Sequence, residues 1–408
     1  MAHVIQSASD CDGVPVAAPR CDTPSMRSGI ALGLALGLAL GGCGFHSPRG
    51  TPSDDSGGGP SIDACASFAS LLDTCALTFD ADLMVTGASS YDTDSNTLVI
   101  AGTATPWAHK TMVIGPDTVE VIAARNVQLA ISATLTATGS HALVIVAQDT
   151  ITVAADAQID VSKGGAGAQG VCANPAMPGQ DSTGGNRGGA GGGGGGFGAS
   201  GGKGGDGNRD STHTQGGALG GAVDAFPEGL HGGCGGAKGG DGDAPGGAGG
   251  KGGGALYLAA AVRIQLDSTG PINAGGGGGQ GGQHVPGDGD GGGGGGGSGG
   301  LLILEAPHII GPGATVAANG GGGGEGSDNN NPGANGAVGS MTTSHASGGM
   351  GQSTTGADGG RGGSIGSGPG ESVIDLLDGG GGGGGGGVGF VRILSSDNQI
   401  GTISPDPS

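Results

Sequence analysis

The chain has 408 residues, of which 107 are glycine, and its formal net charge is −21. Aromatic residues make up 2% of the sequence and charged residues 12%, whereas an ordinary globular domain has roughly 25% charged residues. This composition cannot build one large aliphatic and aromatic core, so the chain is either disordered or uses its glycines in a regular structure. The acidic balance excludes nucleic acid and bare anionic membrane surfaces as partners, because both would repel it.

The segment from Met26 to Cys43 has the features of a bacterial export signal. A basic start and a short apolar run precede Leu40-Gly41-Gly42-Cys43, which resembles the lipobox of bacterial lipoproteins. The apolar run is too short to cross roughly 30 Å of hydrocarbon. The alternative is a buried apolar helix that happens to end in cysteine. We expect residues 26–42 to be a lipoprotein signal peptide and Cys43 to carry the lipid.

Residues 1–25 lie upstream of this signal. We expect translation to start at Met26, which makes residues 1–25 an extension outside the expressed protein. N-terminal sequencing that found Ala2 on the mature protein would contradict this hypothesis. Residues 43–60 are polar and rich in Pro and Gly, as in a flexible tether between a lipid anchor and a folded body.

Seven cysteines are present, and four remain once translation starts at Met26 and Cys43 is lipidated. An even number in an exported chain predicts two disulfides, for which three connectivities are open. The pairs nearest in sequence are Cys65–Cys75 and Cys172–Cys234. Cys65–Cys75 cannot form within one continuous helix, because ten residues rise about 15 Å. The chain would have to bend between these two cysteines.

Residues 61–96 are predicted to form a helical cap and lead-in segment. Ser61 has the character of an N-cap, and apolar residues follow at helical spacing on one face. These residues are Ile62, Cys65, Ala69 and Leu72.

A motif of two apolar residues flanking one other residue recurs every eight residues from Val119 onward. This pattern is typical of strands with one buried face. The first copies are 119–121, 127–129, 135–137, 143–145, 151–153 and 159–161. Later copies are 256–258, 264–266 and 272–274, then 302–304, 309–310 and 316–318, and a last partial copy at 391–393 with Ile400 and Ile403.

Three strands in about 24 residues form the repeating unit, and repeats of this size indicate a solenoid. We expect an all-β fold over residues 97–408, a parallel β-helix of about 24-residue coils. Glycine-rich inserts of about 164–254, 275–300 and 319–387 each follow a third strand, which would place all of them on one corner. The alternative all-β fold is an antiparallel sandwich, which gives no reason for an insert to follow every third strand.

The first strands of the units differ from the others, because they are apolar on both faces. The segments are Leu143–Val146, Leu256–Leu258 and Leu301–Leu304. A strand that is apolar on both sides is covered on both sides. The glycine-rich inserts are the nearest candidates for this cover.

Two structures are open for the inserts. Low-complexity disorder is one. The other is a bundle of polyglycine-II helices with three residues per turn, in which glycine lets backbones approach closely enough to hydrogen-bond. Triplets such as Gly201-Gly202-Lys203 and Gly204-Gly205-Asp206 would put the other residues on an exposed rim. In composition and period the inserts resemble the polyglycine-II modules of phage tail-fibre adhesins, a receptor tyrosine kinase and snow-flea antifreeze protein.

Catalytic and cofactor motifs are weak in this sequence. Gly-x-Gly-x-x-Gly recurs through composition alone, and Lys203 and Lys251 are each followed by Gly, unlike the Lys of a phosphate-binding loop. The pairs Asp241/Asp243 and Asp288/Asp290 would bind Ca²⁺ only weakly, with solvated charge as the alternative, so no cofactor is expected. Parallel β-helices include polysaccharide lyases and hydrolases, but those need clustered carboxylates and aromatic platforms. We therefore expect no catalytic activity.

Taken together, the lipobox, the predicted helix with Cys-Ala-Ser-Phe (65–68), Ser-Tyr-Asp-Thr-Asp (90–94) and Ile-Ser-Pro (403–405) resemble the glycine-rich surface lipoproteins of myxobacteria. The resemblance implies location and architecture and no particular activity. Gly44 after the lipidated cysteine is compatible with sorting to the outer membrane. We expect a lipid-anchored structural or adhesive protein, on the surface or the periplasmic face, with extracellular polysaccharide or other surface proteins as candidate partners. The alternative is a β-helix protein that binds or degrades polysaccharide.

Overall fold

The computed structural model describes residues 67–169, 172–182, 188–207, 217–286, 290–328, 330–366, 368–373 and 379–408. These residues belong to one compact unit, residues 63–408. The predicted signal peptide, Cys43, the tether and Cys65 lie outside the described residues. In the part of the chain that is described, no helix has the length and apolarity needed to cross a membrane.

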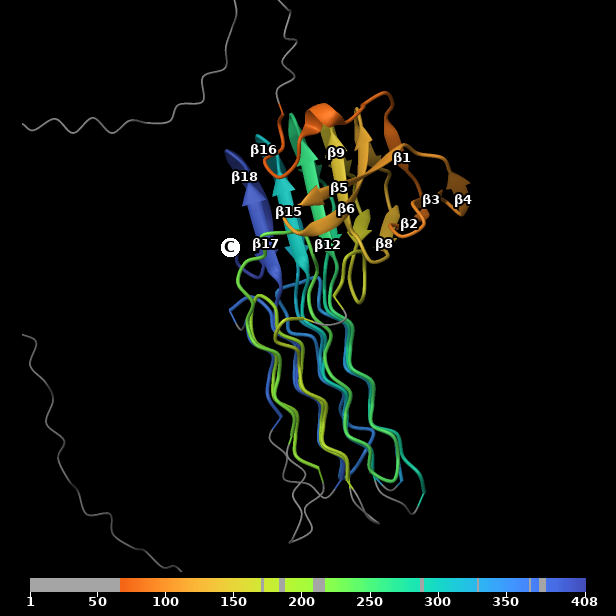
Figure 1. Cartoon of the computed structure of the whole chain (residues 1–408), viewed down its shortest axis with the longest axis vertical. Coiled ribbons are helices and arrows are strands. Elements are labelled where there is room, and N and C mark those ends of the chain that lie inside the picture. Colours follow the sequence, from red (N-terminus) through yellow and green to blue (C-terminus); the bar gives the residue numbers. More distant parts are fainter. Residues whose placement is uncertain are drawn as a thin grey trace, which may run out of the picture. The chain divides into compact units, whose positions relative to one another are not determined.

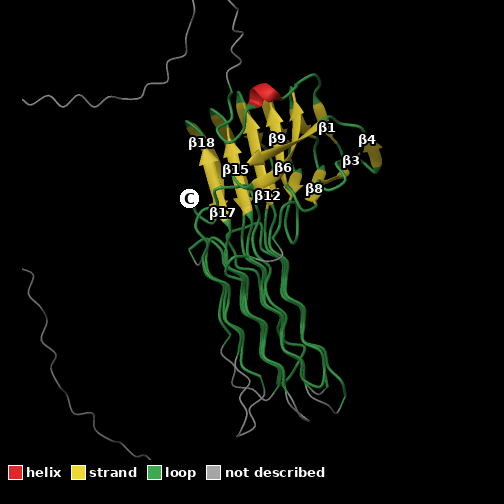
Figure 2. Ribbon diagram, viewed as in Figure 1, coloured by secondary structure: helices red, strands yellow, loops and turns green. Residues whose placement is uncertain are grey.

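The described fold is essentially all-β, with a single 3₁₀ turn, η1 (Thr74–Ala76), and two curled sheets (Figures 1 and 2). The smaller sheet consists, in spatial order, of β17 (Phe390–Leu394), β15 (Leu301–Glu305), β12 (Ala255–Ala260), β9 (Ala142–Ala147), β6 (Asp117–Ala124) and β5 (His109–Ile114). The larger sheet consists of β1 (Leu83–Val85), β7 (Val127–Leu129), β10 (Thr150–Val153), β13 (Arg263–Leu266), β16 (His308–Ala317), β14 (Ile272–Asn273), β11 (Gln158–Asp160), β8 (Thr134–Thr138), β2 (Ala88–Asp92), β3 (Thr97–Ile100) and β4 (Thr103–Thr105), and β18 (Asp397–Ser404) pairs with β16.

Parallel pairing joins each strand to the corresponding strand of the next unit, not to its sequence neighbour. Leu256 of β12 is paired with Leu143 of β9 on one side and with Leu302 of β15 on the other. Only the hairpin pairs β2–β3, β3–β4 and β5–β6 are antiparallel, so both sheets are mixed. The eight-residue motif therefore locates strands correctly from Val119 onward.

Two predictions about the start of the folded body are wrong. Parallel pairing begins at β1 and β2, which pair with β7 and β8, and not at residue 97. The predicted helix over residues 61–72 is absent from residues 67–72, which form bends and irregular chain. Asp73 instead caps η1, with its side chain accepting a hydrogen bond from the Cys75 amide. Ala69 and Leu72 instead pack in the apolar cluster on one face of the smaller sheet without forming a helix.

Both faces of the central strands β9, β12 and β15 of the smaller sheet are buried, as their two-sided apolar sequences predict. One cluster of buried apolar residues lies between the two sheets and includes Leu143, Leu256 and Leu302. The second cluster covers the opposite face of the smaller sheet, where Val144 and Tyr257 lie. Its cover comes from the first glycine-rich insert and from segment 68–79. The covering residues are Phe68, Ala69, Leu71, Leu72, Leu77 and Phe79, with Cys172, Phe197, Phe226, Leu230 and Cys234.

The inserts are extended segments that lie alongside one another beyond one end of the sheets (Figure 1). Backbone hydrogen bonds join them with a period of three residues. Along segment 292–297, successive amides donate to carbonyls of three different neighbours. The acceptors are Gly240, Gly381, Gln280, Ala237, Gly384 and Gly277, at 2.8 to 3.0 Å.

Carbonyls of the same segment accept from three further neighbours, so six segments surround it. Gly192, Gly250 and Gly324 are among the donors, at 2.8 to 2.9 Å. Residues other than glycine lie at the rim in the triplets described above. Lys203 is exposed, and it pairs with Asp206 at 3.5 Å, three residues further on. Lys238 and Asp241 repeat this spacing at 2.6 Å.

Substitution of a central glycine tests this packing. A Cβ at Gly297 would overlap the carbonyl oxygen of Lys251, whereas a Cβ at Gly313 would meet no atom within 4 Å. We expect Gly297→Ala to lower the free energy of unfolding by about 1–3 kcal/mol, the usual cost of overpacking, in chemical denaturation. Gly313→Ala is the matched control and should change it little. Equal effects of the two substitutions would contradict the close packing.

Candidate functional site at the junction of the strands and the first glycine-rich insert

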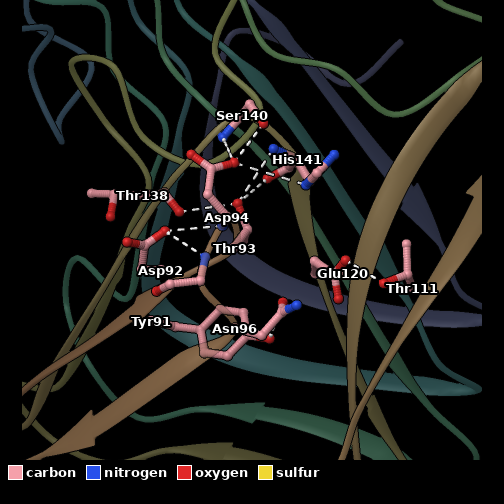
Figure 3. A network of polar contacts seen from close by, with 11 residues as sticks. Tyr91, Asp92, Thr93, Asp94, Asn96, Thr111, Glu120, Thr138, Ser140 and His141 are labelled. Atoms are coloured by element: carbon pink, nitrogen blue, oxygen red, sulfur yellow. Dashed lines mark hydrogen bonds and ion pairs between the residues drawn. The ribbon is translucent and has the colours of Figure 1, made fainter.

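The Ser-Tyr-Asp-Thr-Asp segment forms the end of β2 and the turn into β3. Asp92 shapes this turn, because its Oδ1 accepts hydrogen bonds from the amides of Asp94 at 2.9 Å and Ser95 at 3.4 Å. Asn96 completes the turn with a φ of 54°, a left-handed conformation that asparagine tolerates better than most residues. The turn presents Thr93 and Asp94 toward the loop between β8 and β9 (Figure 3).

Thr93 and Asp94 clamp the loop between β8 and β9. The buried Thr93 hydroxyl donates to the carbonyl of His141 at 2.9 Å or to that of Thr138 at 3.1 Å. Asp94 accepts from the amide of Ser140 at 2.8 Å and from its hydroxyl at 2.5 Å. These bonds from Ser140 lower the pKa of Asp94, and His141 adds a smaller effect. These contacts hold the backbone of Ser140 and His141 in place (Figure 3).

Glu120 is a buried carboxylate, although the sequence pattern predicts it on the exposed face of its strand. The 119–121 motif predicts Val119 and Val121 inside and Glu120 outside. In the structure, Glu120 pairs with Leu143, so it points between the two sheets and is 2% exposed. Because β6 is covered on both faces, alternation along it could not reveal which side faces the interior.

Polar neighbours satisfy the buried Glu120. The Thr111 hydroxyl donates to its Oε1 at 2.6 Å. With the Asn96 amide nitrogen turned inward, Asn96 donates to Glu120 Oε2 at 3.0 Å and to the Tyr91 hydroxyl at 3.3 Å. Burial, with Glu120 and Asp92 adding to it, raises the pKa of Tyr91, so this side chain stays protonated. Thr111, Glu120, Asn96 and Tyr91 thus satisfy one another's polar groups in a structural network (Figure 3).

A polar hollow of about 310 Å³ opens beside this network. Its wall comes from four separate segments, 116–118, 140–142, 167–169 and 230–231. His231 Nδ1 lies 2.8 Å from Asp117 Oδ2. His141 also lines the hollow, and its Nδ1 has no hydrogen-bond partner among the described residues, the nearest carboxylate being that of Asp94 at 3.9 Å. The hollow offers polar groups to a small ligand and one carboxylate, Asp117.

A disulfide between Cys172 and Cys234 closes the same junction, with its Cα atoms 5.8 Å apart. This is one of the pairings that the cysteine count leaves open. Cys75 is also disulfide-bonded, and Cys65, the nearest candidate partner, lies outside the described residues. Cys172, Asp224 and Cys234 are the one group of three His, Cys, Asp or Glu in the described part whose ligand atoms all lie within 4.8 Å of one another. In the disulfide state these cysteines offer no thiolate to a metal ion.

The carboxylates named as weak Ca²⁺ ligands lie elsewhere, in the glycine-rich inserts. Asp241 Oδ1 accepts from Lys238 at 2.6 Å and from the Gly246 amide at 2.7 Å. Asp290 is 2% exposed and its Oδ1 has no partner among the described residues. Asp288 lies outside them, and Asp243 is exposed.

Burial raises the pKa of Asp290 to about 7, and the charge of Asp328 adds to this rise. Burial alone would also raise the pKa of Asp328. Hydrogen bonds from Thr354, Asn330 and Asn331 outweigh that effect and lower it to about 2. The two carboxylates thus have opposite protonation states at intermediate pH.

Two polar side chains beside another hollow have structural partners. Glu371 lies 3.9 Å from the guanidinium of Arg361. His345 Nδ1 lies 3.0 Å from the carbonyl of Gly362 and 3.3 Å from the hydroxyl of Ser364. Sequence reasoning missed Asp117, His141, Asp224 and His231 as junction residues. Asp117, His141 and the other two residues are far apart in the sequence, and no local pattern links them.

Comparison with protein families, curated proteins and solved structures finds no match to this chain.

Removal of the disulfide tests its contribution to the junction. Cys172 and Cys234 are 62 residues apart, and a loop of that length corresponds to about 4 kcal/mol in the chain-entropy model. We expect Cys172→Ser/Cys234→Ser to lower the free energy of unfolding by about 2–4 kcal/mol, measured under oxidising conditions. An unchanged free energy would show that the bond does not form or does not stabilise the fold.

The pKa of Asp290 predicts a pH dependence of stability. It is raised from 3.8 to about 7 in the folded chain, so the protonated carboxyl stabilises the fold fully below pH 3.8. This contribution is lost as the pH rises through about 7. We expect the free energy of unfolding of wild type to fall between pH 4 and 7, and Asp290→Asn to reduce that fall. The exposed Asp406→Asn is the control, and an equal slope in all three proteins would contradict the assignment.

Proposed function

We propose that the chain is a lipid-anchored surface protein that displays a rigid glycine-rich bundle and has no catalytic activity. The body is a parallel β-solenoid, and the inserts on one of its corners form a polyglycine-II bundle. The six hydrogen-bonded neighbours of segment 292–297 carry this proposal. A bundle of this kind displays side chains at its rim on a backbone that is itself closely packed, which suits a structural or adhesive role.

The stacking of corresponding strands supports the solenoid. The pairs Leu143–Leu256 and Leu256–Leu302 repeat the same register from unit to unit. The two-sided burial of β9, β12 and β15 supports an insert that folds back over the solenoid wall. The antiparallel hairpins β2–β3, β3–β4 and β5–β6 then serve as the cap of the first coil.

Each of three hollows in the described part of the chain has at most one carboxylate in its wall. Glycoside hydrolysis ordinarily uses two carboxyl groups roughly 5–10 Å apart on either side of the scissile bond. The hollow beside His231 has Asp117 as its one carboxylate, and the hollow beside His345 has Glu371. A third hollow, beside Trp107, has none.

Membrane attachment through Cys43 is the second part of the proposal. The sequence support is the lipobox at 40–43, and the resemblance to myxobacterial glycine-rich surface lipoproteins points to the outer membrane. The whole chain has a net charge of −21, so its acidic body would be repelled by anionic headgroups. Attachment therefore depends on acyl chains, each buried CH₂ contributing about 0.8 kcal/mol.

The substitution Cys43→Ser tests the anchor. We expect it to move the protein from the membrane fraction to the soluble fraction, because the several acyl chains of a lipoprotein hold it where a single chain would be marginal. Fractionation followed by immunoblotting measures the shift, with Cys75→Ser as a matched cysteine control. A Cys43 variant that still sediments with membranes after a high-salt wash would contradict the lipid anchor.

The polar hollow supports a second candidate function, the binding of extracellular polysaccharide without cleavage. Its volume of about 310 Å³ accommodates one sugar residue, and the groups of Asp117, Ser140 and His231 suit sugar hydroxyls. Binding of wild type and of His231→Ala to a glycan array separates the two candidates. Glycan binding that His231→Ala abolishes would favour this second function, and no binding by wild type would favour the purely structural one.

A further inference from the structure

The cysteine pair at the junction has polar neighbours that a structural disulfide does not require. Asp224 Oδ2 lies 4.0 Å from Cys234 Sγ, and the Gln169 Oε1 lies 3.4 Å from Cys172 Sγ. The sulfurs and the Asp224 carboxylate all lie within 4.8 Å of one another. Two sulfur atoms and one carboxylate oxygen thus lie together, with the Gln169 amide oxygen beside Cys172.

The surroundings of these donors suit a closed site. Cys172 is 7% exposed and Cys234 is 1% exposed, so water has little access to the sulfurs. The backbone is held on both sides of them. The Gln169 amide donates to the carbonyl of Gly233 at 3.1 Å, and the Ser298 hydroxyl accepts from the Cys234 amide at 2.8 Å. The donor positions therefore depend on backbone contacts as well as on the S–S bond.

Zn²⁺ is bound in proteins by Cys thiolates together with His nitrogen or Asp and Glu oxygen, almost always with four ligands in structural sites. Thiolate ligands select Zn²⁺ over the hard cations Mg²⁺ and Ca²⁺. A set of two thiolates and one carboxylate with an amide oxygen beside it has this chemistry. Asp224 Oδ1 accepts a hydrogen bond from the Asn174 side-chain amide at 3.4 Å, and its Oδ2 is the oxygen that faces Cys234 Sγ.

We propose that Cys172, Cys234 and Asp224 bind a thiophilic divalent metal ion of the Zn²⁺ class when the two cysteines are reduced. An added dithiol reductant is oxidised to its own disulfide, and the two electrons and two protons that it gives up convert the Cys172–Cys234 disulfide into two thiols. Metal binding then releases both protons and forms two metal–sulfur bonds, with Asp224 as the third ligand and Gln169 as the nearest candidate for the fourth. The metal ion and the disulfide are alternative crosslinks of the same junction.

Co²⁺ titration of the full chain tests the proposal, because Co²⁺ bound to thiolates gives a charge-transfer absorption that Zn²⁺ abolishes by displacement. The reduced wild type should show this absorption and the oxidised wild type should not. The double variant Cys172→Ser/Cys234→Ser should lose the part of the Co²⁺ absorption that these two thiolates contribute. Asp224→Asn should weaken Zn²⁺ binding by at least about tenfold, in the range found when metal-site groups are altered.

Two controls separate this site from other thiols and from unfolding. Cys75→Ser should retain the Co²⁺ absorption that Cys172 and Cys234 contribute. Asp206→Asn, a substitution on the same insert, should retain the wild-type affinity for Zn²⁺. Zn²⁺ should also raise the thermal midpoint of the reduced wild type but not that of the double Ser variant. An equal Co²⁺ absorption in the double Ser variant, or unchanged Zn²⁺ affinity in Asp224→Asn, would overturn the proposal.

Discussion

The hydrogen bonds between neighbouring glycine backbones are the constraint on which the rest of this structure depends. Around segment 292–297, each amide donates to a different neighbour in turn, and the sequence of partners repeats every three residues. This requires backbones so close that a Cβ at Gly294 or Gly297 would overlap a neighbouring carbonyl oxygen. Each bond contributes only about 0.5–1.5 kcal/mol net, so the bundle needs many of them. The large share of glycine and the small share of aromatic residues follow from this requirement.

A bundle of this kind has little apolar surface, and it therefore depends on the sheets beside it. Phe197 and Leu230 come from the first insert and pack on the outer face of the smaller sheet, where Tyr257 and Ile303 are buried. Glu305 joins the same face to the lead-in segment, because it accepts from the amide and hydroxyl of Ser70 at 2.9 Å. The Cys172–Cys234 disulfide adds a covalent link between the two ends of that insert. Sheets and bundle thus share one apolar layer.

The sequence predicts the strands well because alternation records burial directly. Ile151, Ile264 and Ile309 stand at corresponding places in alternating strands and are paired in the structure. Which side of β6 faces the interior could not be predicted, since both faces of that strand are covered. The buried Glu120 accepts a hydrogen bond from Thr111, a residue of the adjacent hairpin strand. The contacts of Thr93 with His141 span 48 residues, and no local pattern encodes them. The six neighbours of segment 292–297 are equally hidden, because glycine carries no side chain that would distinguish one partner from another.

Hydrogen exchange of the backbone amides tests the account most directly, because the central claim is that glycine amides in the bundle are hydrogen-bonded and buried. We predict that the amides of residues 292–297 exchange as slowly as those of β12, with protection that approaches the global free energy of unfolding. The amides of the exposed residues 341–345 serve as the internal reference for fast exchange. Exchange of residues 292–297 at the rate of an unstructured peptide, while β12 remains protected, would contradict the hydrogen-bonded bundle.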